Sequence, residues 1–241
     1  SLTSIVVEEG NSVYDSREGC NAIIETATNK LIQGCNSTII PSSVTEIGEN
    51  AFEGCTSLTS VVIPEGVTKI GKYAFYDCTS LTSIVVEEGN SVYDSREGCN
   101  AIIETATNKL IKGSNSTIIP SSVTEIGDYA FENCTSLTSV LIPEGVTSIR
   151  CSAFYGCTSL TSVVIPEGVT VIEKAAFYGC TSLTSVVING KIKKIDMVTF
   201  GYCTALESIT LPTGVNKIDA RAFEGCTSLK VINVPAKKKD Y

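Results

Sequence analysis

The sequence predicts a solenoid of stacked coils that is predominantly β, with short helical turns. Three observations predict it: one motif recurs every 23 residues, a phenylalanine and a cysteine keep fixed places in it, and its apolar residues follow a strand pattern. A unit of this length cannot bury its own apolar face, so neighbouring units must stack into a continuous core. The phenylalanines are Phe52, Phe75, Phe131, Phe154, Phe177, Phe200 and Phe223, and a cysteine follows each one three residues later, at Cys55, Cys78, Cys134, Cys157, Cys180, Cys203 and Cys226.

Each coil is expected to begin with a strand, as in residues 160–165. The pattern Leu-x-x-Val-x-Ile places Leu160, Val163 and Ile165 on the inward side, because side chains alternate along a strand. The strand is expected to pair with the equivalent strand of the next coil. These inward positions supply one wall of the core.

A turn and a second short run follow the strand. In Pro166-Glu167-Gly168 the proline restricts φ and the glycine permits a positive φ, which together predict a turn. Val169 and Ile172 then supply the opposite wall, and Ala176-Phe177 is predicted to lie on a tight helical turn that closes the coil. One coil departs from this pattern, because Asn189-Gly190 replaces Pro-Glu, although Asn-Gly is itself a competent turn pair.

Two coils are longer than the others. Residues 2–61 and 81–140 are nearly identical, and the interval from Phe75 to Phe131 exceeds one repeat, so each copy carries one enlarged coil. In the first copy, apolar runs at 21–25 and 29–32 flank the polar residues 26–28. This arrangement predicts a β-hairpin that projects from the stack. The near-identity indicates either a recent duplication or an engineered consensus.

The repeated unit can be written Ile-Pro-x-x-Val-x-x-Ile-x-x-x-Ala-Phe-x-x-Cys-x-x-Leu-x-x-Val. It resembles the BspA-type (Treponema pallidum-type) leucine-rich repeat over nearly the whole chain. The resemblance implies a leucine-rich-repeat solenoid from a secreted or surface-anchored protein, one that attaches to host matrix proteins or to other cells. It also implies a protein partner, while the oligomeric state stays open.

Residues 1–241 are expected to form a single solenoid domain. The chain starts inside a repeat, because Ser1-Leu2-Thr3-Ser4 matches the Ser-Leu-Thr-Ser found downstream. We therefore interpret it as a fragment of a longer chain. No run of about eighteen apolar residues is present, so direct membrane insertion is not expected.

The formal net charge of −8 argues against nucleic acid as a partner. No Lys/Arg-rich stripe is expected to offset the acidic surface. The one basic run noted in the sequence is Lys237-Lys238-Lys239, which we interpret as a solvated tail.

The sequence lacks the residue combinations that usually carry out catalysis. It contains no histidine, which removes Ser–His and Cys–His pairs and the commonest general base. Cys151 and Cys157 do not have zinc-ligand spacing, and the acidic group Glu8-Glu9, Asn11 and Asp15 lacks the ligand rhythm of a calcium loop. We therefore expect no enzyme activity, no catalytic residues, no cofactor and no metal site.

Eleven cysteines raise the question of disulfides. Seven recur at one position of the unit, where stacking predicts a ladder of buried thiols with parallel Cβ vectors, a geometry poorly suited to bridging. Cys20 and Cys35 could pair in the first enlarged coil, but the second copy has Cys99 and Ser114 there. The redox states of these cysteines and of Cys151 are left open.

Two binding surfaces are predicted. The outward positions of the strands should align into an aliphatic row beside small hydroxyls, and this row turns polar at Thr210 and Asn233. A contiguous apolar strip often marks an interaction surface, although the β-propensity of valine is the competing explanation. The row consists of Val62, Val85, Leu141, Val164 and Val187.

The second candidate surface lies on the enlarged coils, residues 11–36 and 90–115. They carry Tyr14, Arg17, Tyr93 and Arg96, which are residue types common at binding hot spots. The alternative is that these coils only alter curvature.

Three functions follow from these features. The first is an adhesive protein-binding module. The second is a structural spacer or engineered scaffold without a ligand of its own, and the third is a carbohydrate-binding module, which the absence of tryptophan weakens.

Overall fold

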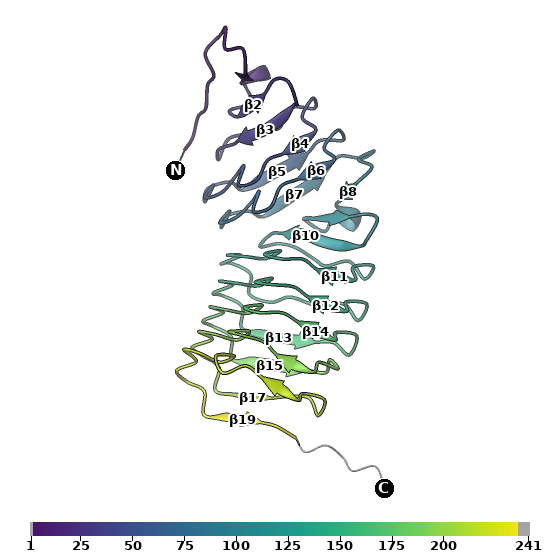
Figure 1. Ribbon diagram of the computed structural model, residues 1–241, viewed down its shortest axis with the longest axis vertical. Helices are drawn as coiled ribbons and strands as arrows, with labels where there is room; N and C mark the ends of the chain where they lie inside the picture. The colour runs from purple at the N-terminus through teal and green to yellow at the C-terminus, as the bar shows by residue number, and fades with distance from the viewer. Residues whose placement is uncertain (1, 236–241) are drawn as a thin grey trace. The chain divides into compact units, whose positions relative to one another are not determined.

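The computed structural model describes residues 2–235 as a β-solenoid (Figure 1). The chain divides into two compact units. The N-terminal unit comprises the residues up to 107 together with 112–117, and the C-terminal unit comprises 108–111 and the residues from 118 onward. The expectation of a single domain over 1–241 stays a prediction, and each unit is described by itself.

The N-terminal unit has two walls. On one wall β5 (Ser60–Ile63) pairs in parallel with β7 (Ser83–Val86), with Ser60 opposite Ser83. We call this wall the sheet face. The opposite wall is a five-stranded sheet in the order β1 (Tyr14–Asp15), β2 (Ile23–Glu25), β3 (Lys30–Gln33), β4 (Glu46–Ile47) and β6 (Lys69–Ile70).

The C-terminal unit repeats this arrangement. Its sheet face contains β13 (Ser162–Ile165) paired with β15 (Ser185–Ile188), and β17 (Ser208–Thr210) paired with β19 (Val231–Asn233). Its opposite wall contains residues 109–110 of β10 (Lys109–Gly113), then β11 (Glu125–Ile126), β12 (Ser148–Ile149), β14 (Val171–Ile172), β16 (Lys194–Ile195) and β18 (Lys217–Ile218).

The first enlarged coil contains the predicted hairpin. In the first copy β2 and β3 are antiparallel, with Glu25 opposite Lys30 and Ile24 opposite Leu31, and β1 adds an antiparallel strand. In the second copy β8 (Tyr93–Asp94) is antiparallel to β9 (Ala101–Glu104). The first hairpin does not project, because β3 pairs in parallel with β4 and so continues the wall.

The core of each unit is built from ladders of equivalent side chains. The Phe154 and Phe177 rings stack with centroids 5.1 Å apart and an interplanar angle of 2°. Leu160, just before β13, and the inward strand residues Val163 and Ile165 are buried, as the alternation predicts. Offset stacking of rings adds to the gain from their burial, so the ladder favours correct coil register.

The closing segment of the coil is not helical, and the prediction of a helical turn at Ala176-Phe177 was wrong. Ala175 has a φ of 56°, which lies in the left-handed region and interrupts any right-handed turn. The equivalent Val198 has a φ of 47°, an unusual conformation for a β-branched residue. Among the described residues the helical elements are two 3-10 turns, η1 (Arg17–Gly19) and η2 (Arg96–Gly98).

The variant turn at Asn189-Gly190 keeps its glycine for a steric reason. In the turn of the preceding coil a Cβ on Gly168 would lie 2.3 Å from the Glu144 carbonyl oxygen, closer than the 3.2 Å found at the equivalent Gly66 and Gly145. In the variant turn a Cβ on Gly190 would lie 2.6 Å from the Val169 carbonyl oxygen. Both turns therefore require a residue without a side chain. The required position differs by one residue in the repeat, because Gly190 aligns with Glu167 and Lys191 aligns with Gly168.

Candidate binding surfaces

Outward-pointing aliphatic side chains line the sheet face of the N-terminal unit. Along β5 and β7 the inward residues are buried, while the outward Val62 and Val85 are exposed and lie directly opposite one another. Two further side chains, Val6 and Ile39, occupy the same repeat position and are more exposed still. The sequence signal for Ile39 is that it stands two residues before a proline, as Val62 does.

The C-terminal unit has the same row. Val164 and Val187 lie opposite one another on β13 and β15, and Ile118 and Leu141 hold the equivalent positions earlier in the chain. We name these eight side chains the sheet-face stripe. In the N-terminal unit it comprises Val6, Ile39, Val62 and Val85, and in the C-terminal unit Ile118, Leu141, Val164 and Val187; their exposed fractions range from 45% to 83%.

The row turns polar near the C-terminus, as the sequence indicates. Thr210 and Asn233 are exposed at the stripe position and lie opposite one another on β17 and β19. The Asn233 amide nitrogen donates a hydrogen bond to Thr210 Oγ1 at 3.2 Å. Thr210 and Asn233 therefore fulfil part of each other's hydrogen-bonding capacity, which the aliphatic side chains of the row do not need.

Hydroxyl groups flank the stripe, but the threonine and serine rows differ. The Thr161 hydroxyl donates to the Thr138 carbonyl oxygen and the Thr184 hydroxyl to that of Thr161, so threonines tie one coil to the next. Ser162 and Ser185 are exposed and lie opposite one another. The serine side chains therefore form an exposed polar edge beside the stripe.

The arginines of the enlarged coils are held by their own coil. The Arg17 guanidinium donates to both carboxylate oxygens of Asp15, at 2.8 and 2.6 Å, and also to Asn29 and Ser43. Its hydrogen bonds lower the pKa of Asp15 from 3.8 to about 2. Arg96 binds Asp94 in the same way. Both arginines thus order the loop around them.

The two tyrosines of these coils have different surroundings. Tyr14 is 38% exposed, whereas Tyr93 is 7% exposed and its hydroxyl accepts a hydrogen bond from the Ile70 backbone N–H. Burial raises the pKa of the Tyr93 hydroxyl. Of the four residues predicted on the enlarged coils, Tyr14 alone is an exposed side chain without a structural hydrogen bond among the described residues.

The cysteines of the repeat form a hydrogen-bonded ladder. The Cys180 thiol donates to the Phe154 carbonyl oxygen at 3.2 Å, and the Cys203 thiol donates to that of Phe177 at the same distance. Burial raises the pKa of Cys180 to about 12, which keeps it a neutral thiol at neutral pH. The ladder therefore has a packing role.

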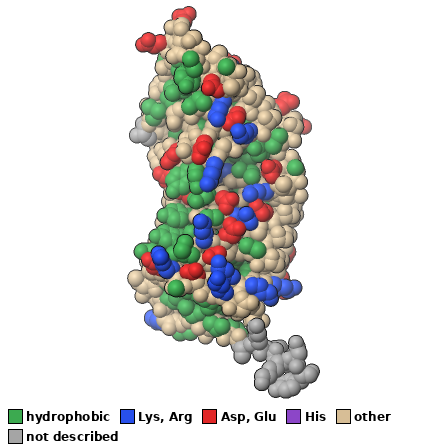
Figure 2. All heavy atoms as spheres, in the orientation of Figure 1, with side chains coloured by type: hydrophobic (Ala, Val, Ile, Leu, Met, Phe, Trp, Pro, Cys, Tyr) green, Lys and Arg blue, Asp and Glu red, His purple; other side chains and the backbone are tan. Residues whose placement is uncertain are grey.

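The wall opposite the sheet face carries ion pairs that were not expected from the sequence. Lys30 and Lys69 each contact Glu46, at 2.9 and 3.2 Å, and Lys109 contacts Glu125 at 2.9 Å. Acidic and basic side chains interleave on the face that Figure 2 shows. In the sequence each of these charged residues stands directly before an inward leucine or isoleucine of the wall, but its ion-pair partner is distant in the sequence.

Within residues 2–235, no group of three or more His, Cys, Asp or Glu side chains is placed to hold a metal ion. The Asn11 side-chain oxygen instead accepts the backbone N–H groups of Val13 and Tyr14, and Asp15 binds Arg17. The described part of the chain contains no helix with the length and apolar character needed to span a membrane.

Comparison with known proteins relates the chain to one family. A family model of the BspA type leucine rich repeat region matches six copies, over residues 24–116 and 124–240. A leucine-rich repeat protein from Eubacterium ventriosum is 25% identical, with a TM-score of 0.75 over 84% of this chain and 55% of that one. A leucine rich cell surface protein from Faecalibacterium prausnitzii is 29% identical, with a TM-score of 0.58 over 84% and 55% of the two chains.

A leucine-rich repeat protein from Bacteroides ovatus is 28% identical, with a TM-score of 0.55 over 97% of this chain and 54% of that one. The chain thus spans about half the length of these solved proteins. No curated protein matches it.

Proposed function

Because the chain belongs to the family of BspA-type leucine-rich-repeat proteins, we propose that it is a non-enzymatic protein-binding module of a secreted or cell-surface protein. In this proposal it attaches to extracellular-matrix or cell-surface proteins through the sheet-face stripe. The similarity to a cell surface protein of Faecalibacterium prausnitzii supports the localisation.

The observation that carries the proposal is the exposure of large aliphatic side chains in a row. Soluble proteins rarely leave contiguous apolar surface in water unless it serves an interaction. The β-propensity of valine accounts for Val164 and Val187, but leucine is not among the strong strand formers. Leu141 is 83% exposed all the same. A binding role explains this residue better than strand preference does.

The carbohydrate alternative receives less support from the described residues. Tyr155 and Tyr178 form a stacked pair with centroids 5.0 Å apart, and Tyr202 packs against Tyr178 at 5.1 Å. A sugar stacks on the open face of an aromatic ring, and in this row most faces are covered by the neighbouring ring. The row therefore favours a structural role over a sugar platform.

Biolayer interferometry on immobilised fibronectin, laminin and collagen would test the proposal. We expect saturable binding by the wild type to at least one of them, and a loss of about tenfold or more in the Leu141→Lys/Val164→Lys variant. The matched control is Ser57→Lys/Tyr202→Lys, which places the same two charges at exposed positions outside the sheet-face strands.

Equal losses in the two variants would remove the stripe from the proposal. If the wild type binds no matrix protein and no cell-surface protein extract, the spacer function replaces adhesion.

A further inference from the structure

The wall of the C-terminal unit contains a row of lysines that interrupts the alternation of charge. On the paired wall strands, charged residues in register are otherwise opposite in sign, as in Lys30 with Glu46 and Lys109 with Glu125. On β16 and β18, however, Lys194 lies directly opposite Lys217. Like charges placed opposite one another destabilise a sheet, and Asp196, whose pKa is lowered by both Lys194 and Lys217, offsets only part of this repulsion.

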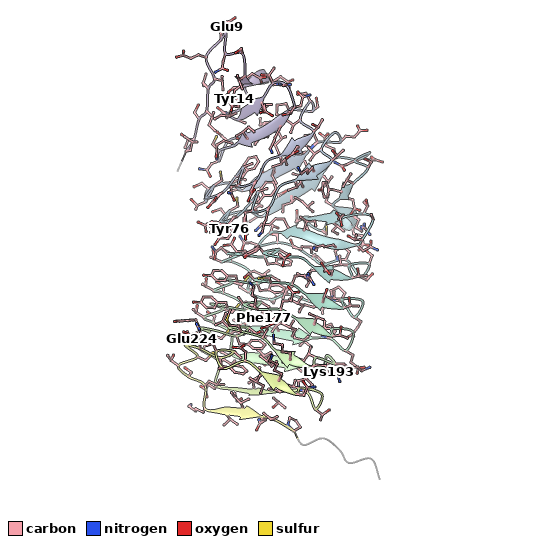
Figure 3. All side chains as sticks on the ribbon, in the orientation of Figure 1. Glu9, Tyr14, Tyr76, Phe177, Lys193 and Glu224 are labelled. Carbon is pink, nitrogen blue, oxygen red and sulfur yellow. The ribbon has the colours of Figure 1, made fainter. Side chains whose placement is uncertain are left out.

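Two more lysines extend this row into a patch. Lys191 and Lys193 precede β16 and are exposed, and Figure 3 shows Lys193 at the edge of the C-terminal unit away from Glu224. The Lys193 ammonium lies over the next coil, 3.3 Å from where a Cβ on Gly214 would stand. We name Lys191, Lys193, Lys194 and Lys217 the lysine patch. The expectation of no basic stripe overlooked Lys191, Lys193 and Lys194, which stand within four residues of sequence, and coil stacking then adds Lys217 beside Lys194. The run Lys237-Lys238-Lys239 lies outside the described residues.

Nearby acids neutralise only part of this charge. Lys194 contacts Asp196 at 2.8 Å, and Asp219 accepts the Arg221 backbone N–H. Glu173, on the preceding coil, binds Arg150 at 2.9 Å. Within the described chain, Lys191, Lys193 and Lys217 form no ion pair. The patch therefore keeps a surplus of positive charge on a protein whose net charge is −8.

Exposed aliphatic side chains adjoin the patch. Val171, on the adjacent strand β14, holds the position equivalent to Lys194 and is exposed. Met197 follows Asp196 directly after β16 and is also exposed. The surface thus combines ammonium groups with apolar area. A nucleic acid would instead favour aromatic or arginine side chains for stacking, and β14, β16 and β18 themselves contain neither.

We propose that the lysine patch binds an acidic segment of a partner protein, whose aliphatic side chains pack on Val171 and Met197. Charge complementarity sets the sign of the partner and favours rapid association. The apolar neighbours select a peptide over a sulfated polysaccharide, which offers charge without aliphatic side chains. This surface is separate from the sheet-face stripe and adds a second contact to the proposed module.

Fluorescence anisotropy with a labelled peptide of alternating glutamate and valine would test this proposal. We expect binding that weakens as salt is raised, and about a tenfold loss in Lys191→Gln/Lys193→Gln/Lys217→Gln. The charge-matched control is Lys69→Gln/Lys109→Gln/Lys230→Gln, which removes the same charge elsewhere and should bind as the wild type does. The Leu141→Lys/Val164→Lys variant should also bind normally, which separates this site from the stripe.

Three outcomes would overturn the proposal. The first is equal binding of a peptide of alternating glutamate and serine, because the aliphatic contacts would then contribute nothing. The second is tighter binding of heparin or single-stranded DNA than of the peptide, which would indicate a general polyanion surface. The third is an equal loss in both lysine variants, because net charge rather than the patch would then govern binding.

Discussion

Residues 11–32 and 90–111 have identical sequences, yet their side chains do not share the same surroundings. Tyr93 is buried beneath the coil that precedes it and accepts a hydrogen bond from Ile70, whereas its counterpart Tyr14 is exposed. In the described chain no coil packs on Tyr14 in this way. Burial in a solenoid is therefore set by the neighbouring coil, because a residue contacts mainly the repeats on either side of it.

The asparagine that opens each copy shows the same dependence. Asn11 and Asn90 both accept two backbone N–H groups with their side-chain oxygens. The Asn90 amide nitrogen also donates to the carbonyl oxygens of Pro64 and Val67, both at 2.9 Å. One sequence thus provides a local turn in the first copy and a turn plus an inter-coil clamp in the second.

Truncating the tyrosines should show the largest difference between the copies. Tyr93→Ala removes a buried aromatic ring and should lower the free energy of unfolding by about 3 kcal/mol. Tyr14→Ala should lower it by less than about 1 kcal/mol, because that ring is partly in water. Urea denaturation followed by circular dichroism would measure both values. Similar values for the two variants would contradict the role given to the neighbouring coil.

Replacing each opening asparagine with aspartate should give a smaller difference. Asn90→Asp keeps the acceptor but loses the two donated hydrogen bonds and places a carboxylate against two carbonyl oxygens, at a cost of about 2 kcal/mol. Asn11→Asp should change the free energy of unfolding by less than about 0.5 kcal/mol, since no described hydrogen bond uses its amide nitrogen. Thermal unfolding of the two variants side by side would test this, and a cost at Asn11 equal to that at Asn90 would count against the clamp.

Exchanging Cys35 for serine should have the smallest effect. The Cys35 thiol donates to the Asn21 carbonyl oxygen, and in the second copy the Ser114 hydroxyl donates to the equivalent carbonyl oxygen of Asn100. Cys35→Ser should therefore change stability by less than about 1 kcal/mol. Unfolding under reducing and non-reducing conditions would check it. A large loss under non-reducing conditions alone would instead indicate a Cys20–Cys35 disulfide.

Much of the fold could be predicted from the sequence, because its determinants are periodic. The interval between Phe154 and Phe177 defines the coil, and the alternation in residues 160–165 identifies the inward side chains. The hairpin was predictable from two apolar runs around a polar turn. The outward stripe follows from the same alternation. Ile39 was also predictable as a stripe residue, because it stands two residues before Pro41, as Val62 stands two residues before Pro64.

Other features were decided only by the tertiary structure. Contacts between coils join residues about one repeat apart, and no local pattern states which side chains meet there. The stacking buries Tyr93 and leaves Tyr14 exposed, and it brings Lys194 beside Lys217. The closing turn is left-handed at Ala175, whose backbone N–H donates to the Met197 carbonyl oxygen of the next coil, despite the helix preference of alanine. Sequence periodicity thus determined the coil, whereas the surroundings of each side chain were determined by the coil above or below it.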